Sequence, residues 1–247
     1  MIDIQDLGVQ FGGVKPIDGL TVQLTKQIVG LIGPNGAGKT TLLNVLSGFV
    51  VPVRGRVSVD GQDLTGVAPH RRAALGLRRT FQTDQIADDL TLRENVLAVS
   101  DHIAFEGGRA AAEKATLAAI DFVGLSRRLN RRGSDLSTEE RHLAEIAKAI
   151  IGAPRLVMLD EPGAGMSETE SAHLERVIKD IPFFCGGPLG KTQVFLVDHD
   201  VALISACCHE TMVLDFGRLL ALGNTHDVLR QPEVQRAYLG SFEELAA

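Results

Sequence analysis

A glycine-rich octapeptide is the segment whose residue types and spacing most clearly predict chemistry: Gly33-Pro34-Asn35-Gly36-Ala37-Gly38-Lys39-Thr40. It matches the phosphate-loop pattern G-x-x-x-x-G-K-[ST]. Glycines let backbone N–H groups converge on phosphate oxygens, Lys39 can reach the β and γ oxygens, and the Thr40 hydroxyl can ligate Mg²⁺. The apolar run Ile28–Ile32 and the helix-forming run Thr40–Leu46 supply the strand and the helix that such a loop requires. The pattern therefore predicts binding of ATP together with Mg²⁺.

A second acidic site follows the apolar run Leu156–Leu159, where Asp160 and Glu161 come directly after four residues that predict a buried strand. The carboxyl ends of strands line the crevice in which α/β sheets bind their ligands. In phosphoryl transfer, one carboxylate at such a place holds Mg²⁺ through water, while a second polarises the attacking water. Together with the phosphate loop, the pair predicts ATP hydrolysis, with Asp160 serving the metal and Glu161 acting as general base.

Strand-like and helical runs alternate in an order that can position both sites. The runs Ile2–Val9 and Ile17–Leu24, joined by glycines, predict an antiparallel pair of strands. Residues 91–151 turn helical, and a further helix is expected over Ser167–Ile178. Beyond residue 154 three strand-like runs return: Leu156–Leu159, Val194–Val197 and Thr211–Leu214. The alternation predicts an α/β fold in which helices cover a parallel sheet.

Composition predicts a soluble globular protein that needs no metal or disulfide to fold. A chain of 247 residues with 45% hydrophobic residues can bury a sizeable core. The neighbouring residues Cys207 and Cys208 are poor disulfide partners, which favours a reducing compartment. No run approaches the roughly 18 apolar residues of a spanning helix, and no basic signal region opens the chain, so secretion is not expected. The net charge of −6 argues against a nucleic-acid-binding face.

In motif order, essentially the whole chain resembles the ATP-binding cassette (ABC) ATPases, through the phosphate loop, the strand that ends in Asp160-Glu161 and further matching positions. The resemblance implies a P-loop NTPase fold with a RecA-like core, an antiparallel β subdomain and an inserted helical subdomain. It also implies one domain over residues 1–247. The core and β subdomain would occupy about 1–82 and 154–247, and the helical subdomain about 83–153.

The resemblance gives roles to single residues. Phe11 matches the aromatic residue that stacks on adenine, and His199 matches the switch histidine that contacts the γ-phosphate. Gln82, in Arg79-Thr80-Phe81-Gln82, matches the Q-loop glutamine that touches Mg²⁺ and relays to the membrane subunits. The implied catalytic residues are Lys39, Glu161 and His199, and the implied metal ligands are Thr40, Gln82 and Asp160. The implied nucleotide-binding residues are Phe11, Asn35, Gly36, Ala37, Gly38, Lys39, Thr40, Thr41, Gln82 and Ser137.

Several segments resemble one subgroup, the ATPases of transporters for branched-chain amino acids and related solutes: Phe11-Gly12-Gly13, Arg79–Gln82, Leu90–Val96, Gly163–Met166 and Pro232–Gly240. The last of these segments is shared with the lipopolysaccharide-transport ATPase. The subgroup implies a cytoplasmic ATPase, peripheral on the inner face of the plasma membrane, that drives import. The implied partners are a second ATPase subunit, two membrane permease subunits and, indirectly, a periplasmic binding protein.

The family's signature sequence, LSGGQ, is replaced here by Leu136-Ser137-Thr138-Glu139-Glu140. Glu139 stands where a family glycine approaches the γ-phosphate held by the partner subunit. A carboxylate about 5 Å from one phosphate charge costs roughly 3 kcal/mol at an effective dielectric near 20. Alternatively, Glu139 turns into solvent while Ser137 caps the following helix and Glu140 completes a capping box. The sequence leaves both interpretations open.

The altered signature also leaves the assembly and the function class open. A heterodimer would have one competent site, which contains Glu161, whereas a homodimer would have two weakened sites. The alternatives to an import ATPase are a lipopolysaccharide-export ATPase and a nucleotide-dependent dimerising module with weak hydrolysis. DNA-repair ATPases need long coiled-coil arms or added DNA-binding domains, so a sequence of this length is not expected to be one of them. Two further departures are Ser167, where the D-loop usually carries Asp or Asn, and the long stretch Pro182–Gly190, which has no functional account.

Overall fold

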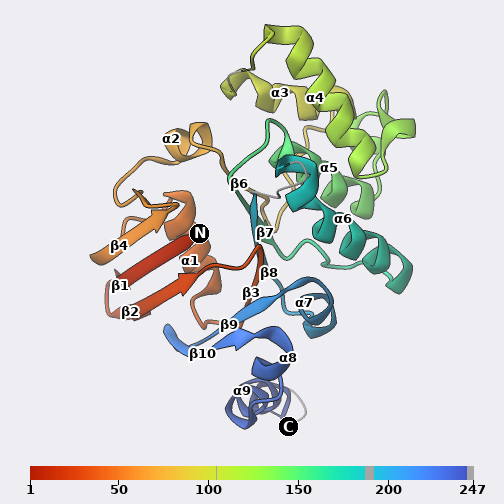
Figure 1. Cartoon of the computed structure of the whole chain (residues 1–247). Helices are drawn as coiled ribbons and strands as arrows, with labels where there is room; N and C mark the ends of the chain where they lie inside the picture. Colours follow the sequence, from red (N-terminus) through yellow and green to blue (C-terminus); the bar gives the residue numbers. More distant parts are fainter. Residues whose placement is uncertain (104, 187–191, 244–247) are drawn as a thin grey trace. The chain divides into compact units, whose positions relative to one another are not determined.

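The computed structural model describes residues 1–103, 105–186 and 192–243, and the chain divides into two compact units (Figure 1). The first unit comprises Met1–Arg72 and Phe195–Ala247, and the second comprises Ala73–Val194. The single domain predicted for residues 1–247, with a helical subdomain over about 83–153, remains a prediction, because the division into two units does not test it.

The first unit contains an antiparallel sheet with the strand order β2-β1-β4-β5. Figure 1 shows β1, β2 and β4 side by side in red to orange. Apolar residues such as Ile2 and Ile4 alternate along β1 and are fully buried, as a half-buried strand requires. The predicted antiparallel pair is therefore confirmed, with Phe11 opposite Val14 across the glycine turn. The strands are β1 (Ile2–Phe11), β2 (Val14–Leu24), β4 (Arg54–Val59) and β5 (Gln62–Asp63).

A second group of strands in the first unit supports the phosphate loop. Strand β3 (Ile28–Ile32) is buried along its whole length, and helix α1 (Lys39–Ser47) begins seven residues after it, as predicted. Strand β3 pairs in parallel with β9, and β9 pairs antiparallel with β10. The other elements are β8 (Gln193–Val197), through which the chain passes from the second unit to the first, β9 (Glu210–Asp215), β10 (Arg218–Asn224), α7 (Val201–Cys207), α8 (Thr225–Val228) and α9 (Pro232–Glu243).

A buried arginine, Arg72 of helix α2 (Pro69–Ala74), forms hydrogen bonds with the C-terminal end of α1. Only 2% of Arg72 is exposed. Its Nη1 donates to the carbonyl oxygens of Val45 at 2.6 Å and Leu46 at 2.9 Å, in the last turn of α1, where carbonyl groups lack the i+4 N–H partner of the helix interior. The same guanidinium donates to the carbonyl oxygens of Leu64 and Val67. One side chain thus satisfies backbone acceptors from a helix and from the loop that follows β5.

Replacing Arg72 by Met is expected to lower the free energy of unfolding by about 2–3 kcal/mol, because buried carbonyl groups would lose charge-assisted hydrogen bonds. Urea unfolding followed by circular dichroism would measure the change, with an unchanged denaturant slope as the sign of an intact native state. Arg71→Met is the matched control, since Arg71 is the exposed neighbour in the same helix. Equal losses for the two variants would show that the carbonyl contacts are not the cause.

The second unit joins a parallel pair of strands to a group of helices. Strand β6 (Leu77–Arg79) pairs in parallel with β7 (Leu156–Asp160), so that Arg79 lies opposite Met158 near the carboxyl end of β7. Helices α3, α4 and α5 contact one another, and α5 contacts α6. Among the described residues, no helix is both long enough and apolar enough to cross a membrane. The helices are α3 (Leu92–Ala98), α4 (Gly108–Phe122), α5 (Thr138–Ile150) and α6 (Glu168–Gly186), with short 3₁₀ turns at Val99–His102, Ser126–Arg128 and Gly133–Asp135.

Three helices of this unit begin with the same local device, a hydroxyl residue that caps the helix and a glutamate three positions later that reaches back. Thr91 and Glu94 form this capping box at α3, and Ser137 and Glu140 form it at α5. Before α6, the Ser167 N–H donates to the Glu170 carboxylate at 2.7 Å and the Glu170 N–H donates to the Ser167 hydroxyl at 3.5 Å. Each box satisfies backbone N–H groups that a helix start leaves unpaired.

Helix α6 is longer than predicted, because it continues past Ile178 to Gly186 and contains Pro182. A proline normally disfavours a helix interior, so the sequence pattern indicated an earlier end. Packing compensates here: Ile181 and Pro182 are buried, and the Phe184 ring stacks on Phe122 of α4 with centroids 4.3 Å apart. The stretch that begins at Pro182 is therefore helical as far as Gly186. Residues 187–191 lie outside the described part of the chain.

Candidate functional site

The phosphate loop of the first unit has the geometry of an anion-binding turn. Lys39, the first residue of α1, donates from Nζ to the carbonyl oxygens of Gly33 at 2.6 Å and Pro34 at 3.0 Å, so its ammonium lies across the loop. The loop residues Asn35 and Gly36 are exposed, and so is Thr40 in the first turn of α1. The arrangement presents backbone N–H groups, an ammonium and a hydroxyl at a helix N-terminus, where the helix dipole favours negative charge.

The loop backbone is held closely by neighbouring strands. Gly38 adopts a φ of 104°, and a Cβ atom there would lie 2.2 Å from the Pro16 carbonyl oxygen, so only glycine fits. The Gly217 N–H, in the turn between β9 and β10, donates to the Ala37 carbonyl oxygen at 3.0 Å. Contacts from both β2 and the β9–β10 turn thus fix the backbone of the loop.

Two other predicted residues of the first unit are exposed. Phe11 ends β1 with 53% of its surface accessible, which leaves its ring available for stacking. His199 follows β8, and 65% of its side chain is exposed. Its Nδ1 lies 3.6 Å from Oδ1 of the buried Asp198. Asp198 Oδ1 also accepts from the Asp200 N–H at 2.9 Å, and Asp200 caps α7.

The acidic pair of the second unit lies at the carboxyl end of β7, as predicted. Asp160 is buried and forms an ion pair with Arg79, in which Nη2 and Oδ2 lie 2.8 Å apart. Only 5% of the Arg79 side chain and 8% of the Asp160 side chain are exposed. The Asp160 N–H donates to the Thr80 hydroxyl at 3.1 Å. Arg79 had no predicted role of its own and belongs only to the motif that contains Gln82. The parallel register of β6 and β7 is what brings its guanidinium to the carboxylate.

Glu161 and Gln82 are in direct contact. Gln82 Nε2 donates to Glu161 Oε2 at 3.0 Å. Glu161 has a φ of 49°, a left-handed conformation that residues other than glycine adopt at a cost of about 1–3 kcal/mol and that concentrates at functional sites. The turn after β7 therefore holds the Glu161 carboxylate against the Gln82 amide.

The altered signature forms an ordinary helix start. The Ser137 hydroxyl accepts from the Glu140 N–H at 3.2 Å, and the Glu140 carboxylate accepts from the Ser137 N–H at 3.1 Å, which confirms the predicted capping box. Glu139 does not simply turn into solvent. Its Oε1 lies 3.6 Å from His173 Nδ1 in α6, and one quarter of its side chain is exposed. His173 of α6 therefore lies beside the carboxylate that stands in place of a family glycine.

One cavity of the second unit lies apart from the predicted residues. It measures about 430 Å³ and is lined by α3, α4 and the turn between them, including Leu97, Ile103 and Arg109. A much smaller cavity borders Asp160, Glu161 and Thr80 at the end of β7. Among the described residues, no group of three or more His, Cys, Asp or Glu side chains could hold a metal ion by itself.

A glycine loop between a buried strand and a helix, with paired carboxylates at the end of another parallel strand, defines a P-loop nucleoside triphosphatase. The family model described as ABC transporter matches residues 18–164, and the chain belongs to this family. It is an ATP-binding subunit of an ABC transporter and an ATPase.

Curated relatives cover nearly the whole chain. The chain is 32% identical to the high-affinity branched-chain amino acid transport ATP-binding protein LivG of Escherichia coli K12, over 97% of this chain and 98% of LivG. It is 31% identical to BraF of Pseudomonas aeruginosa, with the same coverage. It is also 33% identical to the lipopolysaccharide export system ATP-binding protein LptB of Haemophilus influenzae, over 90% of this chain and 88% of LptB.

Solved structures confirm the predicted fold. The ATP-binding cassette MJ1267 superposes with a TM-score of 0.85 at 24% identity, covering 96% of this chain and 98% of MJ1267. The dimeric cassette MJ0796 gives a TM-score of 0.79 at 20% identity, covering 91% and 99% of the two chains. Both likenesses support the P-loop ABC fold.

Proposed function

We propose that this chain powers the import of branched-chain or related amino acids, from the cytoplasmic face of the plasma membrane. The observation that carries the proposal is the end-to-end similarity to LivG and BraF, whose names state branched-chain amino-acid transport. LptB is similar over a shorter part of this chain, which makes lipopolysaccharide export the second candidate. Two permease subunits and a second ATPase subunit complete the proposed transporter, with a periplasmic binding protein delivering the solute.

We propose further that ATP binds with Mg²⁺. Mg²⁺ prefers oxygen ligands and is usually held by one or two carboxylates together with substrate phosphates. Thr40 and Asp160 offer a hydroxyl and a carboxylate, and Gln82 offers an amide oxygen, so the donor set fits the ion. When bound, Mg²⁺ supplies positive charge that stabilises the developing negative charge on the phosphates.

The proposed reaction assigns each residue a role. The amides of residues 35–41 and the Lys39 ammonium bind the phosphates, while the Phe11 ring stacks on adenine. Glu161 takes a proton from water while the oxygen of that water bonds to the γ-phosphorus. At the same time, the bond between the γ-phosphorus and the β-γ bridging oxygen breaks, and ADP leaves with that oxygen. His199 donates to the γ-phosphate. Ser137 contacts the nucleotide that is held by the partner ATPase. Because the signature of this chain is altered, a heterodimer is the favoured assembly.

Replacing Lys39 by Ala tests the nucleotide site. The variant is expected to bind ATP about 10- to 100-fold more weakly, because a charge-assisted hydrogen bond to phosphate contributes about 1.5–3 kcal/mol. Equilibrium binding of a fluorescent ATP analogue to the purified chain would measure this. Lys26→Ala is the control, because Lys26 is exposed in the first unit outside the loop. Unchanged affinity for Lys39→Ala would exclude the phosphate loop as the binding site.

Transport itself is tested in proteoliposomes that contain this chain with two permease subunits and a second ATPase subunit. Uptake of radiolabelled leucine that depends on ATP and is lost with Lys39→Ala would support import. Extraction of lipopolysaccharide in the same preparation, without uptake of any amino acid, would instead select the second candidate.

A further inference from the structure

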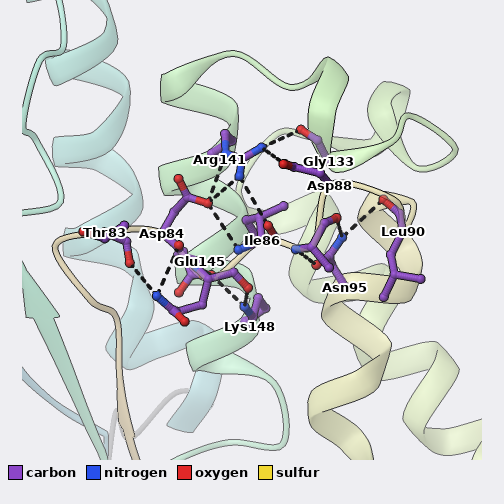
Figure 2. A network of polar contacts seen from close by, with 12 residues as sticks. Thr83, Asp84, Ile86, Asp88, Leu90, Asn95, Gly133, Arg141, Glu145 and Lys148 are labelled. Atoms are coloured by element: carbon purple, nitrogen blue, oxygen red, sulfur yellow. Dashed lines mark hydrogen bonds and ion pairs between the residues drawn. The ribbon is translucent and has the colours of Figure 1, made fainter.

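Three polar side chains form a stripe along helix α5. Arg141, Glu145 and Lys148 are spaced by four and three residues, which places them on one face of the helix. Glu145 is only 5% exposed, although isolated carboxylates are rarely buried. Figure 2 shows the stripe facing the segment Thr83–Asp88, which follows Gln82 and has no regular secondary structure. We call the three residues the α5 stripe.

Arg141 binds the segment Thr83–Asp88 through hydrogen bonds to the side chains of that segment. Its Nε and Nη2 donate to Asp84 Oδ1 at 3.0 and 2.8 Å, and its Nη1 donates to Asp88 Oδ1 at 2.8 Å. Nη1 also donates to the Gly133 carbonyl oxygen at 2.8 Å. The hydrogen bonds to Asp84 and Asp88 raise the pKa of the guanidinium. Burial alone raises the pKa of Asp84, but hydrogen bonds from Arg141 and the Ile86 N–H outweigh it and hold that pKa below its ordinary value.

Glu145 and Lys148 hold the backbone of the same segment. Glu145 Oε1 accepts from the Gln85 N–H at 3.2 Å, and Lys148 Nζ donates to the Gln85 carbonyl oxygen at 2.7 Å. Lys148 also pairs with Glu145 at 2.6 Å, so the buried carboxylate is compensated. From the other side, Asn95 of α3 accepts from the Ala87 N–H at 2.7 Å and donates to its carbonyl oxygen at 3.0 Å (Figure 2). Two helices therefore fix consecutive parts of the segment.

Gln82 lies between two anchors. Upstream, Arg79 and Thr80 are tied to Asp160. Downstream, the α5 stripe holds the chain from Asp84 onward. Only three residues separate Thr80 from Asp84, and each extends the chain by at most about 3.6 Å, so the backbone at Gln82 has little freedom. Its amide is thereby held at 3.0 Å from the Glu161 carboxylate.

We propose that the α5 stripe positions Gln82, and through it Glu161, with Arg141 as the positioning residue. This inference rests on the proposed role of Glu161 in hydrolysis. It also links the signature-bearing helix to the carboxylate end of β7, because α5 carries both Ser137 and the stripe. If Arg141 instead has a purely structural role, it stabilises the fold of the segment Thr83–Asp88 and has no effect on the position of Gln82.

A double-mutant cycle in the assembled transporter separates these two roles. Arg141→Gln is expected to lower kcat about tenfold with KM for ATP changed less than twofold, since small misplacements of catalytic groups can lower rates up to about 100-fold. In a Gln82→Ala background, Arg141→Gln is expected to lower kcat less than twofold further, because the residue through which it acts is gone. Arg141→Lys, which keeps the charge, is expected to recover part of the loss. An equal loss of kcat in both backgrounds would overturn the proposal.

Hydrogen exchange in the nucleotide-free chain tests the same idea without hydrolysis. Arg141→Gln is expected to speed exchange of the Gln85 and Ala87 N–H groups at least tenfold, and unchanged exchange would overturn the proposal. Arg93→Gln is the matched control, because it breaks the ion pair of Arg93 with Glu113, 3.1 Å apart in the same unit. If Arg141→Gln does not fold, the double variant Asp84→Asn/Asp88→Asn removes the same contacts from the acceptor side. Faster exchange together with full turnover by Glu161→Gln would reject the proposed function and leave the anchoring intact.

Discussion

Glu161→Gln is expected to lower ATP turnover of the assembled transporter by about 10²- to 10⁴-fold, because a general base contributes that much to a proton-transfer step. The glutamine keeps the shape of the side chain and can still contact Gln82, but it cannot accept the proton of the attacking water. ATP affinity should change little, since the proposed phosphate contacts come from the loop around Lys39. Phosphate release and binding of a fluorescent ATP analogue, measured on the same preparation, would separate the two effects.

The control for Glu161→Gln is Glu168→Gln, which removes a carboxylate from the exposed first turn of α6 in the same unit. It is expected to leave turnover within twofold. Hydrolysis at the parent rate by Glu161→Gln would remove Glu161 from the role of general base. Attention would then pass to His199, the other predicted catalytic group that is able to accept a proton.

Glu139→Gly is expected to raise turnover of a homodimer of this chain, up to about 100-fold. The upper figure follows from roughly 3 kcal/mol of repulsion between a carboxylate and a phosphate charge at about 5 Å. The contact between Glu139 and His173 reduces the expected gain, because it already draws the carboxylate toward α6, with 3.6 Å between Oε1 and Nδ1. Steady-state hydrolysis at saturating ATP, with dimer content followed by light scattering, would measure the effect.

His173→Gln provides the companion test. In the parent chain it removes the group that faces Glu139, so turnover of the homodimer is expected to fall further. In the Glu139→Gly chain, the same substitution should have little effect, because the carboxylate is absent. Identical turnover for the parent chain and Glu139→Gly would discard the repulsion argument. The altered signature would then work through its helix start alone.

Local sequence rules predicted the elements that carry the proposed phosphate and acid sites. The run Ile28–Ile32 and the strand ending at Asp160 were identified because each is uninterrupted and apolar. The capping box at Ser137 was predicted from residue types three positions apart. These features depend on neighbours in the sequence, so a single chain is enough to recognise them.

Other features depend on residues far apart in the chain, and they were missed. Arg79 and Asp160 are 81 residues apart, and only the pairing of β6 with β7 brings them together. The α5 stripe had a local signal, since Glu145 and Lys148 interrupt the apolar run from Leu143 to Ile150 on the same helix face as Arg141, but its target lies more than 50 residues earlier. Strand β10 was also missed, because Arg218–Asn224 lacks a clear alternation of buried and exposed residues.

The three capped helix starts restrict how this protein can move. Thr91, Ser137 and Ser167 each complete their hydrogen bonds within four residues, so α3, α5 and α6 need no nucleotide to define where they begin. ATP binding would then shift these helices as rigid rods rather than wind or unwind them. The conformational change must then fall in segments that join the elements outside these helices, such as the joint Glu161–Met166 between β7 and α6. Spin labels placed within one helix should therefore keep a constant separation through the ATP cycle, while labels on either side of a joint should not.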